Sequence, residues 1–132
     1  MPINVSWQDE AQAIVCTRFV GHWTMKQFHE AWLQGHDLVL EKSGQQVDFV
    51  FDLERSILIP PNFVRQFREL PFDATQRLGL TVFIGTDEHL VLLIDHIVRS
   101  LSYNLRVAFA EDMTQALELI ARDREGSIAL SA

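Results

Sequence analysis

The chain has 132 residues, of which 48% are hydrophobic, and its formal net charge is −7. This charge argues against a nucleic-acid binder, which needs clustered Lys and Arg, and disfavours attraction to an anionic membrane surface. No apolar run approaches the roughly 20 residues that span a bilayer. A chain of this length is typical of one domain with one large core, so we expect a single domain over residues 1–132.

The first two predicted strands cover residues 3–8 and 13–20, and a polar turn joins them into an antiparallel hairpin. The segment Gly21-His22-Trp23 is expected to end the second strand. That strand contains Cys16, the single cysteine of the chain, so no intramolecular disulfide can form. One cysteine fits a reducing compartment, and residues 1–4 show no signal peptide. We therefore expect a cytoplasmic protein.

A first helix is expected from Thr24 to about Lys42. Thr24 is a typical N-cap residue, and Gln27 three positions later completes a capping box. Ser43 and Gly44 are expected to end the helix. Apolar and small residues recur along one face at helical spacing. They are Met25, Phe28, Trp32, Gly35 and Val39.

The stretch from residue 47 to residue 63 is the most informative part of the sequence. Residues 47–53 have the pattern of a buried strand, and a helix is expected over residues 61–72. Between them, Ile57-Leu58-Ile59-Pro60 is predicted to be an apolar loop. Loops normally run over the surface. This loop therefore either folds over the edge of the core or forms a recognition patch for a protein or an acyl chain.

Two further strand–helix units follow. Residues 78–85 and 105–109 are predicted strands, and Thr86 is expected to cap the helix between them. Asp112 is expected to cap a final helix that ends near Gly126. Leu92 falls on the outer side of its helix. Because a hairpin is followed by alternating strands and helices, the sheet should be mainly parallel with right-handed crossovers.

Alternation within the strands predicts how the helices cover the sheet. One face is expected to carry Phe49, Phe51, Leu53, Leu78, Leu80, Val82, Ile84, Leu105, Val107 and Phe109. The opposite face mixes polar and apolar residues, namely Asp48, Val50, Asp52, Gly79, Thr81, Phe83, Arg106 and Ala108. A sheet covered on both sides would be apolar on both. We therefore expect an α/β fold with an N-terminal β-hairpin and a singly wound, mainly parallel five-stranded sheet, with four helices mostly on one face.

This order of elements resembles the STAS domain (sulfate transporter and anti-sigma factor antagonist), and is more similar to its SpoIIAA-like branch. The likeness spans nearly the whole chain. It is carried by Gly21-His22-Trp23-Thr24, Val50-Phe51-Asp52-Leu53, Val82-Phe83-Ile84-Gly85 and Asp112-Met113-Thr114-Gln115-Ala116-Leu117. The resemblance implies the SpoIIAA-like fold and a binding module, with a regulatory or signalling role, in a bacterial cytoplasm.

One departure from this family bears directly on function. STAS antagonists carry an Asp-Ser-Ser-Gly-like sequence where the helix after this strand begins, and a kinase phosphorylates the serine. Here Asp52-Leu53 matches the strand part, but the helix start reads Ile59-Pro60-Pro61-Asn62-Phe63. Ser56 lies earlier, in the segment before the helix. We therefore expect no phosphorylation switch at the start of this helix.

Three chemical interpretations of other residues are weaker than their structural alternatives. The histidine pairs His29/His36 and His89/His96 are each two helical turns, roughly 10 Å, apart, so neither pair can chelate one metal ion. Cys16 lies within a strand, where cysteine is usually a small buried hydrophobe. Acidic residues at the carboxyl edge of the sheet could form a cation pocket, but they also suit the capping of helices. They are Asp52, Glu54, Asp87, Glu88, Glu111 and Asp112.

We therefore predict a non-enzymatic protein-interaction module that needs no metal or cofactor. Its partner is another protein, which includes a second copy of this chain. The predicted binding residues are Asp52, Glu54, Ser56, Ile57, Leu58, Ile59, Pro60, Pro61, Phe63 and Phe67. The principal alternative is a carrier of lipid or another apolar ligand, because some SpoIIAA-like proteins resemble the CRAL-TRIO lipid-binding fold and the chain is rich in Phe. A third alternative is a hydrolase that uses Asp52 and Glu54.

Overall fold

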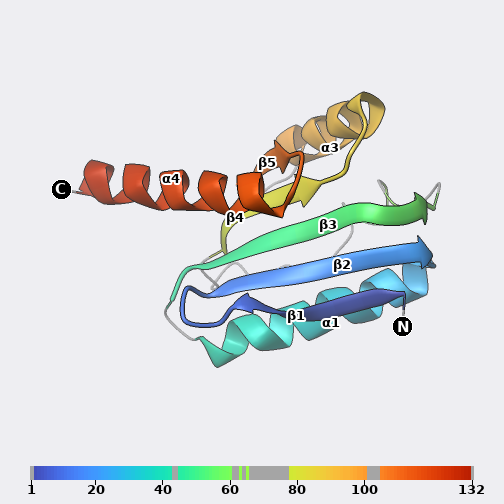
Figure 1. Ribbon diagram of the computed structural model, residues 1–132, viewed down its shortest axis with the longest axis horizontal. Coiled ribbons are helices and arrows are strands. Elements are labelled where there is room, and N and C mark those ends of the chain that lie inside the picture. The colour runs from blue at the N-terminus through green and yellow to red at the C-terminus, as the bar shows by residue number, and fades with distance from the viewer. Residues whose placement is uncertain are drawn as a thin grey trace.

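The computed structural model describes residues 2–42, 45–60, 63, 65, 78–100 and 105–131. Five strands form one sheet in the order β1-β2-β3-β4-β5 (Figure 1). They are β1 (Ile3–Asp9), β2 (Ile14–His22), β3 (Val47–Leu58), β4 (Leu78–Ile84) and β5 (Arg106–Ala110). β1 is antiparallel to β2, as the predicted hairpin requires, and the other neighbours are parallel. The fold is therefore α/β, with a mixed sheet in sequential strand order.

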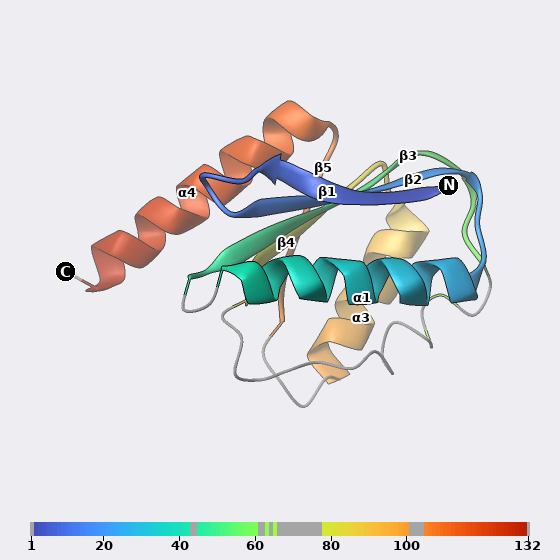
Figure 2. The same cartoon turned by 90° about the horizontal axis from the view of Figure 1, so that it is seen from below.

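Three helices lie within the described residues: α1 (Met25–Glu41), α3 (Glu88–Ser100) and α4 (Met113–Ser131). Figure 2 shows α1 and α3 on one face of the sheet and α4 on the opposite face. α1 connects β2 to β3 and α3 connects β4 to β5, so these two crossovers lie on the same face. The predicted count of four helices differs from these three. The fourth was expected over residues 61–72, which fall almost wholly outside the described residues.

The packing of the two faces differs from the prediction. Phe51 pairs with Phe83 across β3 and β4, so both side chains lie on the face that α1 and α3 cover. Val82 lies on the other face, in the cluster to which α4 contributes Ile120. The prediction that Val82 and the alternate residues of β4 share the face of Phe51 was wrong. β4 is apolar on both faces. A register shift between Val47 and Phe49 of β3 therefore decides which residues of β4 lie on the same face as Phe51.

β2 and β3 continue together past their predicted ends. The register pairs Gly21 with Ser56, and Gly21 has a φ of 66°, a conformation that glycine adopts without steric cost. The predictions that β2 ends before Gly21 and that Ile57 belongs to a loop were wrong, because each segment finds its strand partner in the other. Residues 20–22 of β2 and 55–58 of β3 are called the β2–β3 ribbon below.

The start of α1 agrees with the prediction, whereas the start of α3 is shifted by one residue. Thr24 Oγ1 accepts a hydrogen bond from Gln27 N at 3.2 Å, and Gln27 Oε1 accepts one from Thr24 N at 2.9 Å. At α3, Asp87 Oδ1 accepts from Leu90 N at 2.8 Å, so Asp87 rather than Thr86 is the cap. Asp at this position also complements the helix dipole.

α4 begins as predicted but is longer than predicted. Asp112 Oδ1 accepts a hydrogen bond from Gln115 N at 2.8 Å, which confirms Asp112 as the cap. The helix continues past Gly126, its predicted end, to Ser131. Glycine within a helix costs only about 1 kcal/mol relative to alanine, so it does not oblige the helix to stop. No helix in the described ranges is long and apolar enough to cross a membrane.

A buried carboxylate ties α4 to the amino end of the parallel strands. Asp48 is fully buried, and its Oδ1 accepts from Leu80 N at 2.7 Å while its Oδ2 accepts from Arg124 Nε at 2.6 Å. Arg124 Nη2 also donates to the backbone oxygen of Gln12 at 2.5 Å. A Cβ on Gly79 would lie 1.8 Å from Asp48 Oδ1, so glycine is what allows this close approach. These bonds offset the cost of burying the two charges.

Candidate functional site

The ten predicted binding residues do not form one surface. Five of them are strand residues of β3, namely Asp52, Glu54, Ser56, Ile57 and Leu58. Ile59 and Pro60 lie just beyond the strand, and Pro61 and Phe67 fall outside the described residues. Because successive strand side chains point to opposite faces, this segment contributes to a polar pocket on the α4 face and to an aromatic cluster on the α1 face.

The polar pocket lies where β2 and β3 meet the start of α4. It is a cavity of about 410 Å³ lined by Arg18, Asp52, Glu54, Arg55, Asp112, Met113 and Thr114. The volume is within the range of small-molecule sites. Two predicted residues, Asp52 and Glu54, come together here. Arg18 was not predicted, and its only signal in the sequence is a charge in a largely apolar strand.

Asp52 is the best-anchored side chain of this pocket. Its Oδ2 accepts from Arg18 Nε at 3.2 Å, and its Oδ1 accepts from Glu54 N at 3.1 Å. Both oxygens are therefore engaged by the chain itself. Within the described ranges, no group of three or more His, Cys, Asp or Glu side chains is placed to hold a metal ion. The pocket presents charges of both signs, which suits the polar rim of a binding surface.

Cys16 lies in β2, two residues before Arg18 of the polar pocket. It is buried, with 4% of its surface exposed. This burial raises the pKa of the thiol to about 11, while nearby Arg18 lowers the pKa and Asp52 raises it. The thiolate is the nucleophilic form of cysteine, and at neutral pH Cys16 is a neutral thiol. The position therefore behaves as the small buried hydrophobe that the sequence indicated.

Ser56 is tied to the end of β2 by a tryptophan. Trp23 Nε1 donates a hydrogen bond to Ser56 Oγ at 2.9 Å, and the indole of Trp23 is buried. A buried indole N–H usually needs an acceptor. Ser56 supplies this acceptor across 33 positions in sequence, so local patterns could not reveal the contact. The hydroxyl therefore already has a structural role in the ribbon.

The apolar residues after the ribbon turn toward α1. Phe63 is 2% exposed, and its ring lies 5.6 Å from that of Trp23 and 5.1 Å from that of Phe28, measured between centroids. Ile59 is half-buried and packs against the same core cluster. Both side chains therefore contribute to the interior, as the alternative of a loop folded over the edge of the core predicts.

Among the predicted binding residues that the structure describes, Ile57 is an exposed large hydrophobic residue. Its side chain is 69% exposed although its backbone is part of a paired strand. Val20, on the neighbouring strand of the ribbon, is 38% exposed. Leu92 on α3 is also 69% exposed, which confirms its predicted position on the outer side of its helix. Ile57 differs from Leu92 because it is two residues from Arg55, which lines the polar pocket.

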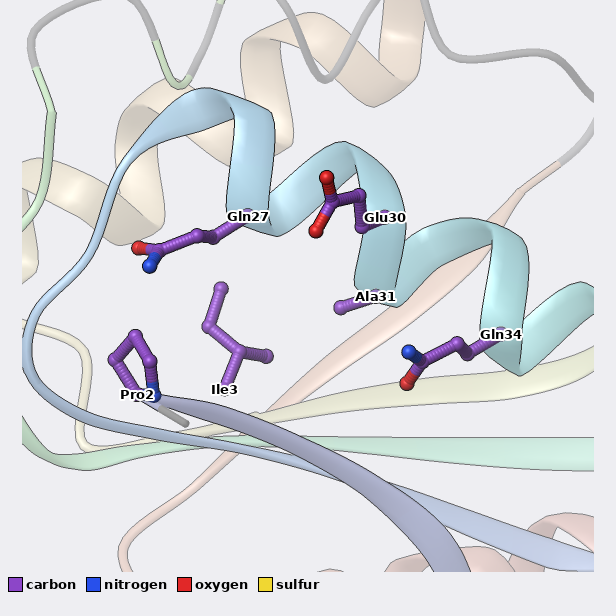
Figure 3. A pocket seen from close by; sticks show the side chains of 6 residues that line it. All are labelled: Pro2, Ile3, Gln27, Glu30, Ala31 and Gln34. Atoms are coloured by element: carbon purple, nitrogen blue, oxygen red, sulfur yellow. The ribbon is translucent and has the colours of Figure 1, made fainter.

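A second cavity lies between the start of β1 and α1. Figure 3 shows its lining side chains, which are Pro2, Ile3, Gln27, Glu30, Ala31 and Gln34. Its volume is about 10 Å³, which is about the room that one water molecule needs. Gln27 Oε1 is already bonded to Thr24 N as part of the capping box. This cavity is too small for an organic ligand.

No family model matches the chain. A search of curated proteins finds no match either.

Proposed function

We propose that this chain is a STAS-like, non-enzymatic protein-interaction module that docks a partner protein on the surface around Ile57. The observation that carries the proposal is an apolar side chain with 69% exposure on a paired strand, next to a polar pocket. Interfaces commonly combine an apolar centre with a polar rim. Ser56 and Leu58 pair with β2 on either side of Ile57 and restrain its backbone before binding, so less conformational entropy is lost on docking.

The contacts of Ser56 support a module without a serine switch. The hydroxyl of Ser56 accepts the indole N–H of buried Trp23. A phosphate on this oxygen would bring about two negative charges next to an aromatic cluster and would disrupt this hydrogen bond. We therefore propose that partner binding depends on the exposed surface of the ribbon and is not controlled by phosphorylation at Ser56.

Packing of the aromatic residues favours docking over the transport of an apolar ligand. The rings of Phe51 and Phe83 lie 5.2 Å apart between centroids, and those of Phe83 and Phe109 lie 5.8 Å apart. These distances are typical of rings in direct contact. The Phe content of the chain suggested a carrier, but the side chains of Phe51, Phe83 and Phe109 pack against one another in the core.

The test compares Ile57→Ser with Leu92→Ser, because the two side chains are equally exposed. Each tagged variant is expressed in its native cell, crosslinked and analysed by mass spectrometry. We expect Ile57→Ser to lose a partner that Leu92→Ser retains, while both variants unfold at the temperature of the wild type. Equal capture by both variants contradicts the proposal. Release of an apolar small molecule from the wild-type chain in native mass spectrometry would instead support a carrier.

A further inference from the structure

β3 continues beyond β4, and within the described ranges it pairs there with β2 alone. The last pair between the two strands is Asp52 with Ile84, whereas β3 remains paired with β2 as far as Leu58. Figure 1 shows β3 reaching past the end of β4. Among the described residues, no strand pairs with the other side of residues 55–58. Half of the backbone N–H and C=O groups in this segment point to that side.

The chain turns away from this edge after β4. Gly85 has a φ of 78°, and a Cβ on it would lie 2.8 Å from Glu54 N. The chain therefore closes against β3 at Glu54 and then leaves the sheet, because α3 begins at Glu88. An extended segment placed beyond Gly85 would continue the line of β4.

Phe63 is the next aromatic residue after β3 that the structure describes. Phe63 packs against Trp23 and Phe28 on the α1 face of the sheet. Its amide N donates to Pro60 O at 2.9 Å. The side chain of Phe63 therefore belongs to the core on the α1 face.

We propose that the partner supplies an extended segment that pairs with residues 55–58 and adds a strand in line with β4. This inference rests on the proposed docking function and specifies how the partner binds. The unpaired backbone groups of a strand edge are a template for another extended chain. Strand addition to such an edge is a recurring mode of peptide recognition. Because β2 already holds residues 55–58 in strand conformation, the edge is preorganised.

The side chains of the ribbon indicate what the added strand carries. Val20 and Arg55 are parallel neighbours, and Arg55 lines the polar pocket on the α4 face. Ser56 accepts a hydrogen bond from Trp23 on the opposite face, and Ile57 follows as an exposed residue where the register shifts from Gly21–Ser56 to His22–Leu58. Opposite charges and apolar residues that face each other across strands stabilise the pairing. The partner segment therefore carries an acidic residue beside Arg55 and an apolar residue beside Ile57, two positions apart.

A phage-displayed library of random peptides, panned on the full wild-type chain, tests this specificity. We expect enriched peptides to carry an acidic and an apolar residue two positions apart. Panning on Arg55→Glu should replace the acidic residue with a basic one. A wild-type-selected peptide should bind Ile57→Ser roughly fivefold more weakly and Leu92→Ser as tightly as the wild type. An unchanged charge preference with Arg55→Glu would overturn the proposed specificity.

Amide hydrogen exchange of the full chain with a selected synthetic peptide tests the strand pairing itself. We expect exchange to slow within residues 55–58 at the amides that face the edge, and to stay unchanged in α3. Peptides that need Ile57 but protect none of these amides would overturn strand addition and leave the docking function standing. Peptides that bind Ile57→Ser and the wild type equally would contradict both. Protection that rises with protein concentration, without peptide, would identify a second copy as the occupant and overturn the proposal.

Discussion

The two ends of the β3–β4 pairing place the same residue type in different surroundings. At the amino end, Asp48 is fully buried, and its two oxygens are held by Leu80 N and Arg124. At the carboxyl end, Asp52 pairs with Arg18, whose side chain is 48% exposed. A buried charge must be paired and hydrogen-bonded to be tolerated, whereas a partly exposed pair retains water that a partner can displace.

This difference separates structure from binding within one strand. Around Asp48, the contacts join β3, β4 and α4, and the carboxylate itself is fully buried. Around Asp52, a pocket of about 410 Å³ opens beside the exposed side chain of Ile57. Changes at the amino end should therefore affect the free energy of unfolding, and changes at the carboxyl end should affect binding more than stability.

The largest effect is expected at Gly79. Gly79→Ala places a Cβ 1.8 Å from Asp48 Oδ1 and should displace the buried carboxylate from its partners, at a cost of about 3–5 kcal/mol. The matched control is Gly126→Ala, since no atom lies within 4 Å of that Cβ. It should raise the free energy of unfolding by up to about 1 kcal/mol. Urea denaturation measures both, and equal effects of the two substitutions would break the comparison.

Removing one charge from each end should give the next largest difference. Asp48→Asn weakens the hydrogen bond from Arg124 inside the core and should lower the free energy of unfolding by about 2–3 kcal/mol. Asp52→Asn weakens a pair with the half-exposed Arg18 and should cost less than about 1 kcal/mol. Both values come from urea titrations at neutral pH. A larger loss for Asp52→Asn would reverse the assignment of the two ends.

The hydrogen bond between Trp23 and Ser56 sharpens the comparison, because it is a structural contact within the ribbon. Ser56→Ala leaves a buried indole N–H without its acceptor and should cost about 1–2 kcal/mol. In a double-mutant cycle with Trp23→Phe, the two losses should not add. Additive losses in urea denaturation would mean that this bond does not stabilise the ribbon.

At neutral pH the smallest effect is that of Cys16 ionisation, which lowers stability only above about pH 9. Burial raises the pKa of the folded thiol from 9.0 to about 11. The unfolded chain therefore loses this proton first, and its ionisation destabilises the fold as pH rises from about 9 to about 11. We expect wild-type stability to fall more steeply than that of Cys16→Ala over this range in thermal unfolding. Parallel pH profiles would contradict the raised pKa.

Local patterns in the sequence predicted the elements whose causes are local. The capping box of Thr24 and Gln27 and the cap at Asp112 depend on residues three positions apart. The hairpin and the sequential strand order follow from the succession of elements. Which residues of β4 face α1 and α3 was not predictable, because both faces of β4 are apolar and a register shift in β3 decides the arrangement.

Contacts between distant segments limited the prediction of the candidate site. The sequence predicted Asp52, Glu54 and Ile57 as binding residues, and the structure places Asp52 and Glu54 in the pocket and leaves Ile57 exposed. Arg18 was missed, because it lies 34 positions from Asp52. The continuation of β3 through Ile57 was missed for the same reason, since its partner is the end of β2.

Partner docking at the ribbon is tested most directly by photo-crosslinking from two positions. A photoreactive amino acid replaces Ile57 in one full-length variant and the equally exposed Leu92 in another, and each is irradiated in its native cell. We predict a discrete covalent adduct with one protein from position 57, and none with that protein from position 92. Adducts of the same pattern from both positions, or none from position 57, would contradict docking at the ribbon.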